Sequence, residues 1–176
     1  LSLRRQRQMC IRDSMEPKPI AELEEYKAAG KLENKVALIT GGDSGIGRAI
    51  AILYAKEGAN VAIGYYDEHQ DAEDTVNRLQ EMGVKAKAYA HDLKDEKQSQ
   101  KLIKDVINDF GSLNILVNNG GVQFPRDHFE DITPQQVKET FMTNIFGMMF
   151  LSQAAVPYLS EGDTIINTTS VTAYRG

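Results

Sequence analysis

The chain has 176 residues, 41% of them hydrophobic, and a formal net charge of −5, which is the make-up of a globular protein with one core. The acidic charge argues against nucleic acid as the main partner, and no apolar run reaches the ~20 residues that a membrane span needs. The single cysteine, Cys10, excludes an internal disulfide and favours a reducing compartment, so we expect a cytoplasmic protein.

Residues 1–14 differ in composition from the rest of the chain. Four arginines and one aspartate give this segment a charge of +3, so the remainder carries −8. The segment lacks the apolar region and small-residue cleavage site of a secretory signal, and residues 9–13 resemble the translation of a sequencing adapter. We therefore expect a non-native tail, with native sequence beginning near Met15. Residues 15–33 are polar, and we predict an arm that lies on the body or on a neighbouring subunit.

The domain predicted for residues 34–176 opens with an apolar run at residues 36–39, which suits a strand buried on both faces. A glycine turn follows, in which Gly41, Gly45 and Gly47 have the spacing G-x-x-x-G-x-G. Glycine lets the backbone turn sharply and approach a ligand closely, and the helix that follows points free N–H groups at the same place. This arrangement predicts a site for the pyrophosphate of a dinucleotide, the alternative being a tight turn that binds nothing.

The rest of the chain alternates between strand and helix patterns. In the first helix we predict an apolar stripe of Ile46, Ile50 and Leu53. The long last helix begins with a Thr-Pro cap at Thr133, and its Met and Phe stripe predicts core or a subunit interface. The further elements are strands at residues 61–66, 84–90, 113–119 and 163–170, and helices at about 70–82, 95–110 and 134–159.

Alternating strands and helices predict an α/β fold, a Rossmann-type doubly wound parallel sheet that is truncated after its fifth strand. Ligands of such sheets bind beyond the carboxyl ends of the strands. Polar residues stand at these ends: Asp67 after the second strand, Asp92 after the third, Asn118 at the end of the fourth and Ser170 at the end of the fifth. The sequence therefore predicts one site at one edge of the sheet.

Four motifs resemble those of the short-chain dehydrogenase/reductase family. They are the glycine turn from Thr40 to Gly47, the Asn-Asn-Gly-Gly run at residues 118–121, Asn144 in a long helix, and Ser170 at a strand end. The resemblance covers about residues 31–176 and is greatest to a bacterial branch of glucose/ribitol-dehydrogenase-like or general-stress oxidoreductases. Gly120 replaces an alanine of the family motif, which removes no chemistry.

The resemblance implies an NAD(P)-dependent oxidoreductase that moves a hydride between the nicotinamide and an alcohol, sugar or aldehyde, and that assembles as a homo-oligomer, a tetramer in the family. Ser170 would hydrogen-bond the reacting oxygen of the substrate, and Asn144 would support a water of the proton relay. No metal is implied. The implied cofactor-binding residues are Gly41, Asp43, Ser44, Gly45, Ile46, Gly47, Tyr65, Asp67, Asp92, Leu93, Asn118 and Gly120.

Two of these residues have alternative interpretations that need no cofactor. Asp92 would accept a hydrogen bond from the adenine amino group, or it could cap the helix that follows. Asn118 would hold the backbone near the cofactor, or it could only stabilise the end of its strand.

The family's general acid/base motif, Tyr-x-x-x-Lys, is absent beyond Ser170. Tyr174 is no substitute, because it stands only four residues past Ser170 and has no lysine partner. We therefore interpret the chain as the N-terminal portion of an enzyme, inactive in this form. The alternatives are a non-catalytic dinucleotide-binding module and a Rossmann methyltransferase, against which Asn118, Asn119 and Ser170 argue.

The segment after the second strand favours NAD weakly over NADP. Residues 65–74 contain five acids and no Lys or Arg, whereas a basic residue normally meets the 2′-phosphate of NADP. Position 44, directly before Gly45, is a serine rather than a basic residue. Against this preference, Tyr65 rather than an acid ends the strand.

Overall fold

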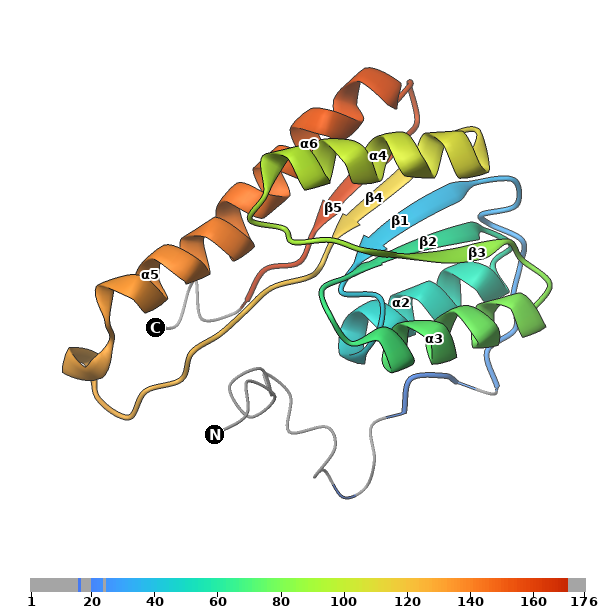
Figure 1. The fold of residues 1–176 in the computed structure, drawn as a ribbon. Helices are drawn as coiled ribbons and strands as arrows, with labels where there is room; N and C mark the ends of the chain where they lie inside the picture. Colours follow the sequence, from blue (N-terminus) through green and yellow to red (C-terminus); the bar gives the residue numbers. More distant parts are fainter. Residues whose placement is uncertain (1–15, 17–19, 24, 171–176) are drawn as a thin grey trace.

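The computed structural model of the chain describes residues 16, 20–23 and 25–170. The tail expected at residues 1–14, and Tyr174, lie outside the described residues. The body is a five-stranded parallel sheet of order β3-β2-β1-β4-β5. Helices α2 and α3 cover one face of the sheet, while α4 and α6 cover the other (Figure 1). This is the doubly wound, Rossmann-type arrangement that the sequence predicts.

The elements follow one another along the chain in βα order. The strands are β1 (Val36–Thr40), β2 (Asn60–Tyr65), β3 (Ala86–Ala90), β4 (Ile115–Asn118) and β5 (Thr164–Asn167). The α-helices are α2 (Gly45–Lys56), α3 (His69–Glu81), α4 (Glu96–Phe110), α5 (Pro134–Phe141) and α6 (Gly147–Ala155). The described residues also form the short helical segments η2 (Phe129–Asp131), η3 (Met142–Phe146) and η4 (Val156–Tyr158).

Two apolar clusters, one on each face of the sheet, form the core. Ile39 and Val61 belong to the cluster beneath α2 and α3, and Leu38 and Leu116 belong to the cluster beneath α4 and α6. Every residue of β1 is buried, because β2 and β4 flank it and helices cover both its faces. This is why β1 shows an unbroken apolar run rather than an alternating one.

The stripe predicted for the first helix is wrong at two of its three positions, since Ile50 packs against the core but Ile46 and Leu53 do not. Ile46 is 64% exposed and Leu53 is 40% exposed. The helix packs through a neighbouring stripe of small residues and one isoleucine, which lets it lie close to the sheet. The buried residues of α2 are Gly47, Ala51, Ile52 and Ala55.

The last two predicted elements differ in detail from the structure. The single long helix is divided into α5 and α6 by the π-helical turn η3, although the path stays continuous and extends past the carboxyl edge of the sheet (Figure 1). The fifth strand ends at Asn167, three residues before Ser170. None of the described helices is both long and apolar enough to cross a membrane.

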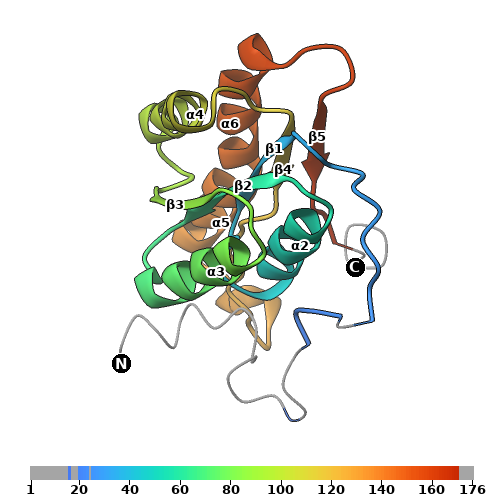
Figure 2. The same ribbon diagram turned by 90° about the vertical axis from the view of Figure 1, so that its right-hand side faces the viewer.

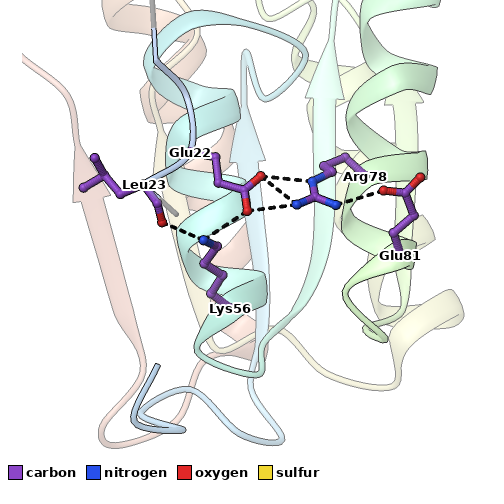
Figure 3. A network of polar contacts seen from close by, with 5 residues as sticks. All are labelled: Glu22, Leu23, Lys56, Arg78 and Glu81. Atoms are coloured by element: carbon purple, nitrogen blue, oxygen red, sulfur yellow. Dashed lines mark hydrogen bonds and ion pairs between the residues drawn. The ribbon is translucent and has the colours of Figure 1, made fainter. Parts of the chain in front are cut away.

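The described part of the arm lies against the body of the same chain, as Figure 2 shows beside α2. Glu22 bridges two helices: its carboxylate lies 3.0 Å from Nζ of Lys56 on α2 and 2.9 Å from a guanidinium nitrogen of Arg78 on α3 (Figure 3). Further along, Glu57 accepts hydrogen bonds from the Tyr26 hydroxyl and from the backbone N–H of Lys31. The arm therefore ties the C-terminal ends of α2 and α3 together.

Candidate functional site

The carboxyl ends of the strands lie level along one edge of the sheet. Thr40 at the end of β1 pairs with Gly64 of β2, and Tyr65 at the end of β2 pairs with Ala90 of β3. Asn118 of β4 pairs with Asn167 of β5. The loops that carry the predicted site residues therefore all open at this edge, as the sequence predicts.

The glycines of the turn after β1 are required for two different reasons. Gly41 and Gly45 have φ angles of 64° and 54°, a left-handed conformation that other residues rarely adopt. Gly47 is required by contact, because a Cβ there would lie 2.0 Å from the carbonyl oxygen of Gly41. At Gly45, in contrast, no atom of the described residues lies within 4 Å of an added Cβ, so the space beside it is open.

The start of α2 offers backbone N–H groups beside this open space. Ser44, the N-cap residue, makes no side-chain hydrogen bond to the helix, and the first turn contains no acidic residue. Gly45 and Ile46 are both exposed. Unsatisfied N–H groups at the positive end of a helix bind anions such as a pyrophosphate. Asp43 is 9% exposed, and its carbonyl accepts a hydrogen bond from the Thr75 hydroxyl of α3.

Thr40 joins this turn to the loop after β4; the sequence analysis includes it in the glycine-turn motif but not among the cofactor-binding residues. Its Oγ1 accepts hydrogen bonds from the backbone N–H groups of Asn119 and Gly120, both at 2.9 Å. The Asn119 side chain donates in return to the carbonyl of Thr40 at 3.1 Å. Gly120 also lies close to Gly41, since a Cβ on Gly41 would be 3.0 Å from the Cα of Gly120. The sequence signal for this role is a hydroxyl residue directly before the glycine turn, at the end of the strand.

At the end of β2, Tyr65 contacts the first residue of α3. Its hydroxyl lies 2.8 Å from Nδ1 of His69, and the two rings meet edge to face. Asp67 is exposed in the loop between them. Tyr65 and Asp67 are thus at the carboxyl edge as predicted, with His69 as a third side chain that the sequence analysis did not single out.

Asp92 does not cap the helix that follows. That role belongs to Asp95, whose carboxylate accepts from the N–H groups of Lys97 and Gln98. Asp92 accepts from the N–H of Lys94 at 3.0 Å and remains partly exposed in the loop after β3. The helix-cap alternative is therefore wrong, and the Asp92 carboxylate instead contacts Lys94 within its own loop.

Leu93 lies at the junction of three segments of the site. A Cβ on Gly120 would be 3.1 Å from the Leu93 Cδ1, and a Cβ on Gly147 of α6 would be 3.0 Å from the Leu93 Cβ. Gly120 and Leu93, both predicted site residues, are thus in contact. Gly147, which lets α6 approach them, was not predicted, because a helical glycine alone does not indicate what it faces.

Asn118 is buried and has a structural role at the edge of the sheet. Its side-chain amide donates to the Ser152 hydroxyl of α6 at 3.1 Å and to the Asn167 side chain of β5 at 2.8 Å. It therefore fixes β4 against β5 and α6, as the alternative interpretation proposes. Its Oδ1 has no hydrogen-bond partner among the described residues.

The two predicted catalytic residues occupy separate segments on the β4–β5 side of the site. Asn144 lies in the π-turn, where its Oδ1 accepts from the N–H of Val122 and its Nδ2 donates to the carbonyl of Val122, both at 2.7 Å. These bonds explain an asparagine in mid-helix, because it holds the loop after β4. Ser170 is exposed, beyond the end of β5. Among the described residues, no three His, Cys, Asp or Glu side chains gather as a metal site requires.

Known proteins with similar sequences and structures point to one family. Residues 35–176 match the family model described as short chain dehydrogenase. General stress protein 39 of Bacillus subtilis is 48% identical over 170 residues, which are 97% of this chain and 59% of that protein. The glucose and ribitol dehydrogenase of Daucus carota is 42% identical over 170 residues, which cover 92% of this chain and 58% of that protein.

A crystal structure of a short chain dehydrogenase from Burkholderia cenocepacia in complex with NADP superposes with a TM-score of 0.79 at 37% sequence identity. The match covers 82% of this chain and 59% of that one. The chain thus spans about three fifths of the length of these relatives. Since the family model covers residues 35–176 and the level strand ends carry the family's motifs, the chain belongs to the short-chain dehydrogenase/reductase family.

Proposed function

We propose that this chain binds a nicotinamide dinucleotide and forms the cofactor-binding part of an oxidoreductase. The observation that carries the proposal is the open space at Gly45 beside the uncapped start of α2. A pyrophosphate in this space would accept hydrogen bonds from the first N–H groups of the helix. The relatives named as dehydrogenases, and the relative solved with NADP, support this use of the space.

The predicted residues would hold the cofactor along the edge of the sheet. Tyr65 and Asp67 would contact the adenosine ribose, Asp92 would accept from the adenine amino group, and Leu93 would pack on the base. Gly120, fixed by the Thr40 hydroxyl, would let the backbone pass close to the cofactor. When bound, the nicotinamide accepts or donates the hydride, and the protein supplies position and proton management.

Ser170 and Asn144 have the roles expected of them in the reaction of the whole protein. Ser170 would donate a hydrogen bond to the reacting oxygen of an alcohol, sugar or aldehyde. Asn144 would support a water of the proton relay, and its two hydrogen bonds to the Val122 backbone would hold its side chain in place.

The proposal includes a cytoplasmic protein that favours NAD and forms a homo-oligomer. The acids in residues 65–74 and the lack of Lys or Arg there oppose the 2′-phosphate of NADP. Apolar side chains exposed along the last long helix provide a surface for a second copy. They are Val137, Phe141, Ile145, Phe146 and Met149.

A titration with two ligands separates this proposal from the alternatives. NADH and S-adenosylmethionine are added in turn to the 176-residue chain, and binding is followed by calorimetry. We expect saturable binding of NADH and none of S-adenosylmethionine. Binding of S-adenosylmethionine alone would instead support a methyltransferase. If a protein extended with a Tyr-x-x-x-Lys segment also binds NADH but reduces no aldehyde or sugar, a non-catalytic module is favoured.

A further inference from the structure

His91 is a buried histidine directly before Asp92, and nothing in the proposed reaction uses it. Its side chain is 6% exposed. Its ring lies over Gly64 of β2, because a Cβ on Gly64 would be only 2.6 Å from Cε1 of His91. Its backbone N–H donates to the carbonyl of Tyr65 at 2.9 Å, so His91 also joins the ends of β2 and β3.

Among the described residues, neither Nδ1 nor Nε2 of the ring has a hydrogen-bond partner of normal geometry. Burial has the largest effect and lowers the pKa of His91, although the backbone groups of Tyr89 and Tyr65 and the Asp92 carboxylate favour the charged form of the ring. The buried position over Gly64, which we call the inner position, therefore stabilises the neutral ring relative to the protonated one.

A cavity beside the ring could hold it in a second orientation. The cavity has a volume of about 290 Å³ and lies between β3 and α4. His91 forms part of its wall, together with Gln98 and Leu102 of α4. Lys101 and Asp105 are on the same wall, and their side chains form an ion pair at 2.5 Å. A ring that turned into this cavity would meet water and a carboxylate.

We propose that His91 is a proton-sensitive positioning residue for Asp92. The neutral ring stays over Gly64 and holds the ends of β2 and β3, and with them the adenosine part of the cofactor site. The protonated ring turns into the cavity beside Asp105, and the loop that carries Asp92 moves with it. This inference rests on the proposed function, because it assigns the ends of β2 and β3 to cofactor binding.

The charges around the ring decide in which direction affinity changes with pH. The loop after β3 contributes Asp92, which pairs with Lys94, and α4 contributes Lys101 and Asp105. Strand β3 contributes the Tyr89 phenol, which donates to Asp109, and β2 contributes the backbone carbonyl of Tyr65. Because the lowered pKa belongs to the inner position, that position is favoured above the ordinary histidine pKa and is lost as the pH falls below it.

The test compares the NADH dissociation constant at about pH 7.5 and about pH 5, the second value lying well below the ordinary histidine pKa because the pKa of His91 is lowered. We expect the unaltered chain to lose about fivefold or more in affinity at the lower pH, a typical size for coupling between two sites. His91→Phe keeps an apolar ring over Gly64 and should bind NADH equally at both values. His128→Asn changes an exposed histidine in the loop after β4 and should follow the unaltered chain.

A second variant, Gly64→Ala, should displace the His91 ring from Gly64 into the cavity without a change of pH. The methyl group of Gly64→Ala would overlap Cε1 of His91 and displace the ring, so NADH affinity at about pH 7.5 should fall to the acid level. Histidine NMR spectra of the unaltered chain, and of His91→Phe for assignment, should show His91 titrating below the ordinary range together with the loss of affinity.

Three results would overturn the inference. They are the same pH dependence in His91→Phe as in the unaltered chain, a normal NADH affinity in Gly64→Ala, and a His91 signal that titrates at the ordinary histidine pKa. In each case NADH would still bind at neutral pH and the proposed function would stand. A failure of the unaltered chain to bind NADH at about pH 7.5 would overturn both.

Discussion

Strands β1 and β5 belong to one sheet, yet they lie in different surroundings. All five residues of β1 are buried, whereas three of the four residues of β5 are exposed. The difference extends to the helices, because α2 and α4 each bury four residues and α5 buries none. The half of the molecule around β1, where the proposed nucleotide site lies, therefore has its own core. The half around α5 and β5 leaves apolar surface exposed.

The largest expected effect is a contrast in stability between the two strands. Leu38 of β1 is 0% exposed and Ile166 of β5 is 40% exposed. We expect Leu38→Ala to lower the free energy of unfolding by about 3 to 5 kcal/mol and Ile166→Ala by about 1 kcal/mol or less. Urea denaturation followed by circular dichroism measures both. Equal losses of unfolding free energy in the two variants would contradict this difference, because they would mean that β5 is packed as completely as β1.

Removal of the Thr40 hydroxyl should have the next largest effect. Thr40→Val leaves the N–H groups of Asn119 and Gly120 without their acceptor, which costs about 2 kcal/mol or more of stability. NADH affinity should fall about tenfold, because these groups fix the loop beside the glycine turn. Thr140→Val is the matched control, since its hydroxyl donates to the Gln136 carbonyl one helical turn earlier and lies away from the glycine turn. An equal loss of affinity in the control would contradict the role of Thr40.

Cofactor choice should be a smaller effect, confined to the end of β2. We expect NADPH to bind roughly tenfold more weakly than NADH, a difference of about 1.4 kcal/mol. Asp67→Arg places a cation where the 2′-phosphate would lie and should reduce the difference between the affinities for NADH and NADPH. Glu73→Arg makes the same change of charge on the exposed side of α3 and should leave the ratio unchanged. Tighter binding of NADPH than of NADH by the unaltered chain would overturn the preference.

The smallest expected effect concerns the arm. Hydrogen bonds from the Tyr26 hydroxyl and the Lys31 N–H lower the pKa of Glu57. The attachment of the arm is therefore complete above the ordinary glutamate pKa and weakens as the pH falls through the lowered value. Glu57→Gln should reduce the protection of the Ala29 and Lys31 amides against hydrogen exchange at neutral pH. Glu81→Gln, at the far end of the Glu22 network, should leave these two amides protected.

The sequence predicts the half around β1 better than the half around β5. An apolar run followed by a glycine turn predicts a buried parallel strand that leads into a helix. The structure confirms this prediction with β1 and α2. The predicted Ile46 stripe is wrong because small residues let α2 approach the sheet through Gly47 and Ala51 instead. Hydrophobic periodicity cannot show which of two neighbouring stripes lies closer to the sheet.

Long-range contacts explain what the sequence left out of the site. Thr40 and Gly120 are eighty residues apart, and only the pairing of β1 with β4 brings the hydroxyl to the loop. The contact between Gly64 and His91 depends in the same way on the register of β2 with β3. The predicted residues at the strand ends were found because every parallel strand ends at the same edge, a rule that needs no knowledge of register.

The central claim is that the turn at Gly45 holds a pyrophosphate, and one pair of variants tests it most directly. Gly45 and Gly83 both have positive φ angles, and at both an added Cβ would meet no atom of the described residues within 4 Å. Valine should therefore strain the backbone about equally at the two positions, by roughly 1–2 kcal/mol. Only Gly45→Val would also fill the space that the cofactor needs.

The measurement is the affinity for NADH by calorimetry, with folding of each variant checked by circular dichroism. We expect Gly45→Val to lose NADH affinity by about a hundredfold or more while it stays folded, and Gly83→Val to bind NADH like the unaltered chain. Unchanged NADH affinity in folded Gly45→Val would contradict the claim.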